Sequence, residues 1–491
     1  MRYLRYKTHR SSIGTLLLQL TCCTAVVLGC NRGPRPSPVT EEVSTPLLSV
    51  SSVNPRYFTD GSRAIYLTGS HNPLIVDKGD SWPPRGYDWA SFLDYAQLKG
   101  HNFIRVWTWS TTKNKYDDNS NWVYTYPQPW KRTGPGDSAD GLGLKFDLNT
   151  FDDEYFRRVV HIVELAKTRG IYISLMLFDG WASFRTKYHY TPFTSGNNIQ
   201  GVGVVDADGD GKQEELQTLD PGHTGIGVGQ SKVIVDAEDA YVRHLIDITN
   251  SYDNVIYEIA NEPAPTSMAW ANHFVDLIHT YQQTKPFRHA ILLGTYYQYP
   301  PSRGINDWLF AGKAEAVSPA FPAASPYDFK MNPPPADGAK VVIADNDHID
   351  PKFTDPTFVW RHFMRGNNPI IVDEDTTPLH RRSRAYEAIR DAMGDTRRYA
   401  NRIDLLHMAP STTVCSTQFC LVNPGVEYLV YQPNRGVPFT VDLSRYSGKK
   451  FATEWFDTFS RRNSLAVDVA GGAVVTFTPP AASTVIYLKA R

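Results

Sequence analysis

The sequence predicts an α/β fold, a (β/α)8 TIM barrel, followed by a small antiparallel β-sandwich. From residue 56 onward, apolar runs typical of strands alternate with segments in which apolar residues recur at helical spacing. Eight such strands precede residue 400. Beyond Arg398, short strand-like runs are separated by turn residues with no helical period between them, which is typical of a sandwich. An open doubly wound sheet is the alternative to the barrel, but no glycine-rich phosphate loop follows an early strand.

The barrel strands are expected at residues 63–71, 103–109, 171–179, 255–262, 290–295, 314–318, 340–345 and 369–373. The fourth strand ends on Asn261, Glu262 and Pro263. A carboxylate is costly at the end of a buried strand unless it is needed there, and barrel chemistry lies at the carboxyl ends of the strands. Glu262 is therefore a catalytic candidate, although Asn261 is also suited to cap a following helix.

The first residues read as an export signal, with a basic leader before a short apolar run. The run ends on Val26-Val-Leu-Gly-Cys30, which resembles the lipobox of bacterial lipoproteins, whose cysteine becomes lipidated. An ordinary signal with an incidental cysteine is the alternative. We expect a signal peptide at 1–29, a flexible tether at 30–51, and a protein exported and lipid-anchored to a bacterial membrane, on its periplasmic or cell-surface side.

The remaining chain is too long for one core, so we expect a catalytic barrel at 52–400 and a sandwich at 401–491. The formal net charge is −1 and no basic stripe is present, which argues against nucleic-acid binding. Aromatic residues make up 12% of the chain, which suits a carbohydrate partner because apolar sugar faces stack on rings.

Asn261-Glu262-Pro263 at the end of the fourth strand, together with Arg105 late in the second, resembles the pattern of clan A of the retaining glycoside hydrolases, the cellulase-like barrels. The chain is most similar to the apiosidase-like bacterial group, through the runs 130–136 (WKRTGPG), 176–181 (MLFDGW) and 345–348 (DNDH). The resemblance implies a glycoside hydrolase that cleaves an O-glycosidic bond in a poly- or oligosaccharide and needs no cofactor for catalysis.

Such hydrolysis uses two carboxyl groups, and the resemblance assigns the acid/base role to Glu262 and a sugar-binding role to Asn261. The clan places its nucleophile, a glutamate, at the end of the seventh strand, where this sequence has Asp345 and Asp347. We prefer Asp345, with Asp347 next, whereas Glu374 follows the eighth strand. Because aspartate is shorter than glutamate, an inverting mechanism is the alternative to a retaining one.

Other residues are expected at the same opening because they lie at strand ends or just beyond them, and we predict that they bind substrate: His71, Arg105, Trp107, Asp179, Trp181, Tyr296 and His348. Arg105 would also keep a neighbouring nucleophile ionised. For each of them, packing or orientation of a neighbour is the alternative role.

A separate acidic segment after the third strand resembles a calcium loop, with predicted ligands Asp206, Asp208, Asp210 and Glu214. The twelfth position from Asp206 is Gln217, so the segment does not fit an EF-hand and a shorter loop is expected. A solvated acidic turn is the alternative.

The C-terminal sandwich resembles a module that accompanies this barrel group and is described as collagen-binding, although fold similarity does not carry binding function. Cys415 and Cys420 are predicted to form a disulfide in an exported protein. The second functional class is a non-catalytic lipoprotein that binds carbohydrate or matrix, because the seventh strand departs from the clan pattern.

Overall fold

The computed structural model describes residues 46–186, 188–204, 209, 211, 214–219, 232–296, 298, 302, 304–320, 326–345, 355–372 and 384–491. Residues 43–491 form one compact unit. Within the described ranges no helix is long and apolar enough to cross a membrane.

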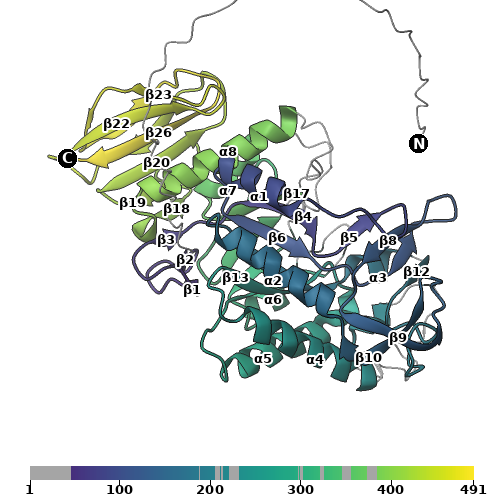
Figure 1. Ribbon diagram of the computed structural model, residues 1–491. Helices are drawn as coiled ribbons and strands as arrows, with labels where there is room; N and C mark the ends of the chain where they lie inside the picture. The colour runs from purple at the N-terminus through teal and green to yellow at the C-terminus, as the bar shows by residue number, and fades with distance from the viewer. Residues whose placement is uncertain are drawn as a thin grey trace, which may run out of the picture. The chain divides into compact units, whose positions relative to one another are not determined.

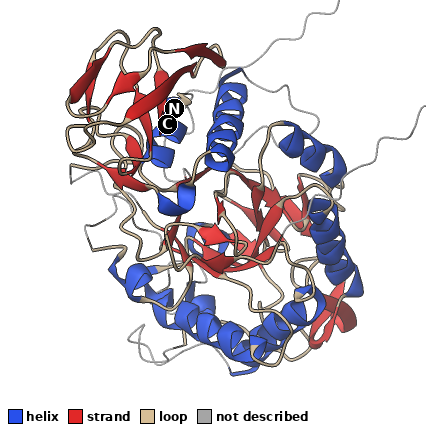
Figure 2. Cartoon of the chain, turned by 90° about the vertical axis from the view of Figure 1, so that its left-hand side faces the viewer, coloured by secondary structure: helices blue, strands red, loops and turns tan. Residues whose placement is uncertain are grey.

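Eight parallel strands close into a barrel in the order β11-β13-β14-β15-β16-β17-β4-β6, which confirms the predicted fold class. Helices surround this ring of strands (Figure 2). The strands are β4 (Gly69–Leu74), β6 (Phe103–Trp107), β11 (Tyr172–Asp179), β13 (Val255–Asn261), β14 (Ile291–Gly294), β15 (Ala316–Ser318), β16 (Val341–Asp345) and β17 (Asn368–Val372). In chain order β13 is the fourth barrel strand and β16 the seventh, as the sequence predicts.

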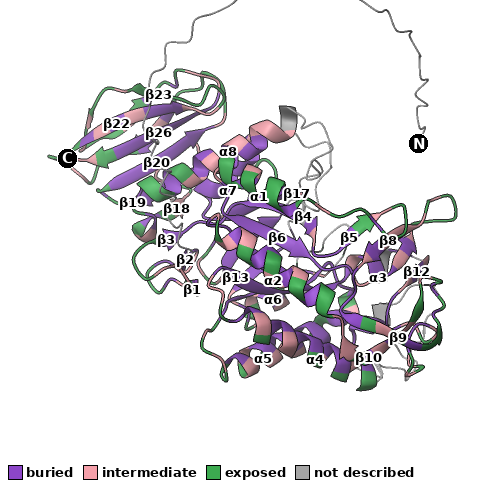
Figure 3. Cartoon of the chain, in the orientation of Figure 1, coloured by how far each residue is buried: buried purple, intermediate pink, exposed green. Residues whose placement is uncertain are grey.

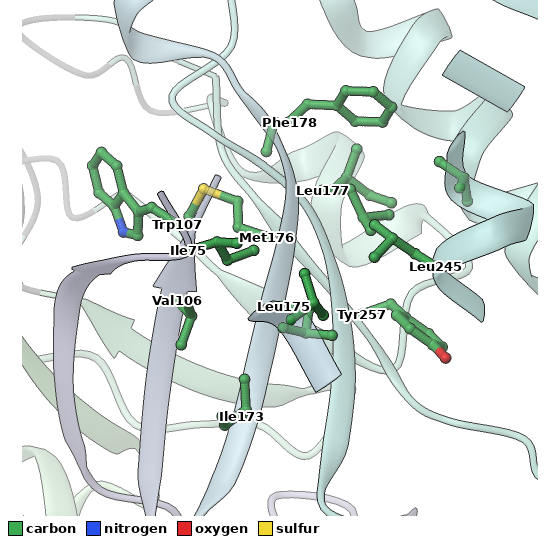
Figure 4. Close-up of a cluster of buried hydrophobic side chains, with 14 of the residues drawn as sticks. Ile75, Val106, Trp107, Ile173, Leu175, Met176, Leu177, Phe178, Leu245 and Tyr257 are labelled. Atoms are coloured by element: carbon green, nitrogen blue, oxygen red, sulfur yellow. The ribbon is translucent and has the colours of Figure 1, made fainter. Parts of the chain in front are cut away.

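The strands β6, β11 and β13 are buried at every residue, because one face lines the interior and the other meets the helices. Figure 4 shows this alternation along β11: Leu177 lies on the side of Leu245 from a surrounding helix, while Met176 lies beside Trp107 and Ile75. The sequences of these three strands are therefore nearly continuous apolar runs, so a charged residue within one of them is unusual.

The helices that cover the barrel are amphipathic. The side chain of Asp152 caps the N-terminus of α2 by accepting a hydrogen bond from the Glu154 backbone N–H at 2.9 Å. The buried residues of α2, such as Val159 and Val163, recur at helical spacing, and exposed residues line the opposite side of the helix (Figure 3). The helices are α1 (Trp89–Leu98), α2 (Asp153–Lys167), α3 (Trp181–Arg185), α4 (Lys232–Thr249), α5 (Met268–Gln282), α6 (Asp307–Ala311), α7 (Thr357–Met364) and α8 (Arg384–Arg402), with short 3-10 turns η1 (Glu214–Gln217), η2 (Pro265–Ser267) and η3 (Leu405–His407).

Three smaller sheets, which the sequence did not reveal, are separate from the closed barrel. An antiparallel four-stranded sheet has the order β12-β7-β8-β5, and its strands β5, β8 and β12 lie near α3 in Figure 1. Its strands are β5 (Asp77–Gly79), β7 (Lys113–Lys115), β8 (Val123–Tyr126) and β12 (Tyr188–Tyr190). A hairpin joins β9 (Trp130–Asp137) to β10 (Leu144–Phe151), and a small sheet joins β1 (Ser49–Val50), β2 (Phe58–Thr59) and β3 (Ala64–Ile65).

The C-terminal part consists of antiparallel sheets, consistent with the predicted sandwich. The larger sheet contains β18 (Ala409–Ser411), β19 (Cys420–Asn423), β20 (Glu427–Gln432), β26 (Thr484–Ala490), β22 (Lys450–Asp457), β23 (Arg462–Leu465) and β24 (Val469–Ala470), and the smaller pairs β21 (Phe439–Asp442) with β25 (Val474–Phe477). Cys415 and Cys420 form a disulfide with their Cα atoms 6.5 Å apart.

The strand β20 of the larger C-terminal sheet is buried on both faces. Along β20, Tyr428 and Val430 belong to the sandwich core, whereas Leu429 and Tyr431 belong to a cluster shared with α7 and α8. The rings of Trp360 on α7 and Tyr431 are stacked with centroids 6.0 Å apart. The barrel and the sandwich therefore share a continuous apolar core.

Candidate active site

Arg105 lies inside the barrel and is 1% exposed. Its Nε donates hydrogen bonds to both carboxylate oxygens of Glu258, at 2.7 and 2.9 Å, and Ser174 Oγ donates to Glu258 Oε2 at 2.9 Å. Burial raises the pKa of Glu258, while the neighbouring Arg105 charge opposes that rise. These contacts supply hydrogen-bond donors to the buried Glu258 carboxylate and orient the Arg105 guanidinium.

Glu258 was not recognised from the sequence. It lies in the middle of β13, with apolar or aromatic neighbours on both sides. That single carboxylate within a buried strand was the available signal, because an ionised group in such a place requires a partner.

The other side of the Arg105 guanidinium contacts Asp345 at the end of β16. Arg105 Nη1 donates a hydrogen bond to Asp345 Oδ2, and His71 Nε2 lies 3.1 Å from Asp345 Oδ1. Asp345 is 3% exposed. Both carboxylate oxygens therefore face nitrogen atoms, which hold the side chain in one orientation.

The orientation of His71 is set by Trp107, whose Nε1 donates a hydrogen bond to His71 Nδ1 at 3.1 Å. With Nδ1 accepting, the proton of the neutral imidazole belongs on Nε2, which faces Asp345. A row of rings continues from this point: Trp107 is stacked on Trp109 at 6.2 Å, and Trp109 lies 5.8 Å from Trp181. Four predicted cleft residues, His71, Arg105, Trp107 and Trp181, are thus linked through direct contacts.

Asn261 and Glu262 lie at the end of β13. Asn261 Oδ1 accepts a hydrogen bond from Arg105 Nη2 at 3.1 Å, and the other group of this amide is a hydrogen-bond donor. Glu262 is 6% exposed and has a φ of 47°, in the left-handed region that non-glycine residues rarely adopt. Strained backbone of this kind clusters at functional sites.

Gly180, directly after β11, accommodates this turn. A Cβ atom at Gly180 would lie 2.3 Å from the Asn261 carbonyl oxygen and 2.6 Å from Pro263 N. A side chain at this position would therefore push apart the two strand ends that carry Asp179 and Asn261.

Asp179 is a further carboxyl group near the site whose pKa is perturbed. Burial raises its pKa to about 7, opposed by the hydrogen bond from the Ala182 backbone N–H and by the charge of Lys78. Asp179 lines a cavity together with Gln128 and Gln217, and Gln217 Nε2 donates to the Asp179 carbonyl oxygen at 2.9 Å. A carboxyl that titrates near neutral pH is able to hold or release a proton under ordinary conditions.

One described residue of the predicted set, Tyr296, is not joined to this cluster by a described contact. Tyr296 is stacked on Trp308 at 6.3 Å, and among the described contacts none joins it to Arg105. The other predicted residues lie outside the described part of the chain, so their roles stay predictions: Cys30, Asp206, Asp208, Asp210, Asp347, His348, Glu374 and the side chain of Glu214.

The arrangement therefore offers a carboxylate held by a cation, a second carboxyl on a strained turn, an amide donor and a row of aromatic rings. In chemical terms it can attack an electrophilic carbon, transfer a proton to a leaving group and bind hydroxyl groups.

The comparisons with known proteins concern the fold. No protein-family model matches the chain, and no curated protein is significantly similar to it. Among solved structures, a glycoside hydrolase family 5 protein from Bacteroides vulgatus has a TM-score of 0.53 at 14% identity, with 90% of this chain and 93% of that chain covered. A candidate glycoside hydrolase from the same organism has a TM-score of 0.57 at 13% identity, covering 93% of this chain and 84% of that one. A third structure, named as a glycoside hydrolase, has a TM-score of 0.53 at 13% identity over 91% of this chain and 97% of its own. The chain thus shares its two-part fold with proteins named as glycoside hydrolases.

Proposed function

We propose that this protein is a glycoside hydrolase that cleaves an O-glycosidic bond in a poly- or oligosaccharide. The observation that carries the proposal is the position of Asp345 at the end of the seventh barrel strand, held by Arg105 and His71. Glu262 follows the fourth strand and supplies a second carboxyl at the carboxyl ends of the strands. The similarity to solved structures supports the fold on which this proposal rests.

In the proposed mechanism, Glu262 donates a proton to the oxygen of the leaving sugar while a carboxylate oxygen of Asp345 attacks the anomeric carbon. The bond to the leaving oxygen breaks, and the remaining sugar is held on Asp345 as an ester. Glu262 then removes a proton from water, whose oxygen attacks the same carbon and releases Asp345.

The neighbours of the two carboxyl groups support these roles. The Arg105 guanidinium contacts Asp345 and holds the proposed nucleophile in place. Arg105 holds the Asn261 side chain through its oxygen, and we assign to the amide group of Asn261 the binding of a sugar hydroxyl next to the reacting carbon. The rings of Trp107 and Trp181 are suited to stack on sugar faces.

We further propose that the chain is exported and attached to a bacterial membrane through lipid on Cys30, on the basis of its leader sequence. Fractionation of cells that express wild type or Cys30→Ala tests this: the protein should move from the membrane to the soluble fraction in the variant. Membrane attachment that persists in Cys30→Ala would contradict the lipid anchor.

Turnover of a panel of plant and microbial glycans tests the proposed activity. Glu262→Gln and Asp345→Asn should each lower kcat by about 10³-fold or more, since each removes a group that acts on the reacting bond. Glu164→Gln, an exposed position on α2, is the matched control and should retain full activity. Glycan binding without turnover by the wild type would favour the non-catalytic alternative.

The stereochemical outcome tests the retaining version of the mechanism. Proton NMR of the first products should show the anomeric configuration of the substrate. Inversion would mean that Asp345 activates water instead of attacking the sugar.

A further inference from the structure

One face of the four-stranded sheet β12-β7-β8-β5 carries tyrosines and lysines in neighbouring positions. In the cross-strand pairing Tyr188 is opposite Lys115, Tyr190 is opposite Lys113, and Lys113 is also opposite Tyr124. Directly paired residues point to the same side of a sheet, so these five side chains share one face.

The two faces of this sheet differ in burial. Asn114, Thr125 and His189, which alternate with the tyrosines and lysines, are buried. The tyrosines and lysines of the opposite face are all partly exposed. That face is consequently available to a ligand from solution.

Trp122 lies beside two of these five side chains, Tyr190 and Lys113. Its ring lies 6.1 Å from the Tyr190 ring, and the ammonium group of Lys113 lies 4.7 Å from the Trp122 ring centroid. Lys115 Nζ lies 4.7 Å from the ring centroid of Tyr188. We call the six residues Lys113, Lys115, Trp122, Tyr124, Tyr188 and Tyr190 the aromatic face.

The lysine charges on the aromatic face are weakly compensated. Among the described residues, Lys113 has no carboxylate within ion-pair distance, and its charge is stabilised by ring faces. Lys115 Nζ lies 3.6 Å from Asp118 Oδ1, but the Asp118 side chain is 77% exposed, so this pair is weak. Ammonium groups set between rings complement a ligand that combines apolar faces with negative charge.

The aromatic face is linked to the active site through the chain. β5 and β7 directly follow the barrel strands β4 and β6, which contain His71 and Trp107, and β12 follows β11 and α3, with Asp179 at the end of β11. A long ligand bound to this sheet would therefore be held near the barrel mouth, at a place separate from the bond that is cleaved.

We propose that the aromatic face binds a segment of a carboxylate-bearing polysaccharide, with sugar rings packed on Trp122 and the tyrosines and uronate groups paired with Lys113 and Lys115. This inference rests on the proposed function for the class of ligand, since it takes the substrate to be a glycan. Sugar C–H faces pack on aromatic rings, and carboxylates form charge-assisted hydrogen bonds with ammonium groups.

Affinity electrophoresis of the full chain, carrying Glu262→Gln to prevent turnover, tests the proposal with polygalacturonate and alginate as acidic probes and xyloglucan as a neutral probe. We expect retardation by an acidic probe that weakens with added salt. The double variant Lys113→Gln/Lys115→Gln and the variant Trp122→Ala should each weaken that binding about tenfold or more. Lys450→Gln and Phe459→Ala remove an exposed lysine and an exposed aromatic ring from the C-terminal part of the chain and should bind like the parent.

Equal retardation of the face variants and the parent would overturn the proposal, as would retardation by xyloglucan alone. Binding of a poly-dT oligonucleotide through the same residues would assign the face to nucleic acid and overturn it too. Circular dichroism and melting temperature show that each variant is folded. Turnover by the wild type is measured in a separate assay. Turnover without polymer binding would refute the proposed role of the aromatic face alone, whereas binding without turnover would refute only the proposed hydrolase activity.

Discussion

Arg105 Nε donates hydrogen bonds to Glu258 at 2.7 and 2.9 Å, and the same guanidinium reaches Asp345 on its other side. A buried ion pair is expensive to desolvate, so it is weak evidence for stability alone. Here the pair has a second consequence, because Glu258 fixes the group that contacts Asp345. Glu258 is therefore a positioning residue of the site.

Glu258→Gln should lower both stability and turnover. The variant keeps the shape of the side chain but leaves a buried guanidinium short of one counter-charge, which we expect to reduce the free energy of unfolding by about 3 kcal/mol. Because Asp345 acts in bond formation, kcat should fall while KM changes little. Urea unfolding and steady-state kinetics measure the two effects.

Glu454→Gln is the control for a salt bridge at the surface. Glu454 accepts a hydrogen bond from Arg402 Nη1 at 2.6 Å, and its loss should change stability by less than about 1 kcal/mol. A Glu258→Gln variant with unchanged kcat would show that Glu258 serves the fold alone.

Gly180→Ala should reduce both activity and stability. The added methyl group would overlap the Asn261 carbonyl oxygen and Pro263, so the turn that carries Glu262 must shift. Overpacking costs about 1–3 kcal/mol, whereas a displacement of about 1 Å at a catalytic group can cost about 10²-fold in rate. In Gly86→Ala the added atom has its nearest neighbour at 3.9 Å, so this control should be close to wild type. Equal kcat values for both alanine variants would refute the positioning role.

Asp179 should make stability depend on pH between about 4 and 7. The unfolded chain releases this proton near the ordinary pKa of 3.8, but the folded chain holds it until about pH 7. The folded state thus binds more protons in this window, and the free energy of unfolding falls as pH rises through it. The total change corresponds to about 4 kcal/mol.

Asp179→Asn should remove most of this pH-dependent decrease in the free energy of unfolding. The stability of the variant relative to wild type should therefore be higher at pH 8 than at pH 4.5. Urea unfolding at the two pH values provides the comparison, with the exposed Asp94→Asn as control. Parallel pH dependence in wild type and Asp179→Asn would rule out the raised pKa.

Trp107→Phe should lower kcat although the ring is retained. The change removes the Nε1 hydrogen that His71 Nδ1 accepts, so the imidazole is no longer held with its proton toward Asp345. Loss of a buried hydrogen-bond partner costs about 1–3 kcal/mol, or roughly 5- to 150-fold in rate if the whole cost appears in the transition state. Trp109→Phe is a matched control, because Trp109 Nε1 has no hydrogen-bond partner among the described residues. Similar kcat values for the two phenylalanine variants would exclude a role for the hydrogen bond.

The barrel and several of its strand-end residues were predictable because they depend on local patterns. Buried parallel strands produce apolar runs, and amphipathic helices produce a helical period. Counting these runs placed Glu262 after the fourth strand and Asp345 at the end of the seventh, in agreement with the structure. The small sheet that carries the aromatic face was missed, since strands of three or four residues are too short to show a period.

The contacts around Arg105 depend on tertiary structure. Arg105 is separated by 153 residues from Glu258 and by 240 from Asp345, and only the closure and register of the barrel bring the three side chains together. A residue's type and its place on a strand follow from local sequence, because propensity and burial act over a few residues. Which charges face each other across the interior, and how far burial moves the pKa of Asp179, is decided by the packing of distant segments, because electrostatic interactions depend on distance and on the exclusion of water.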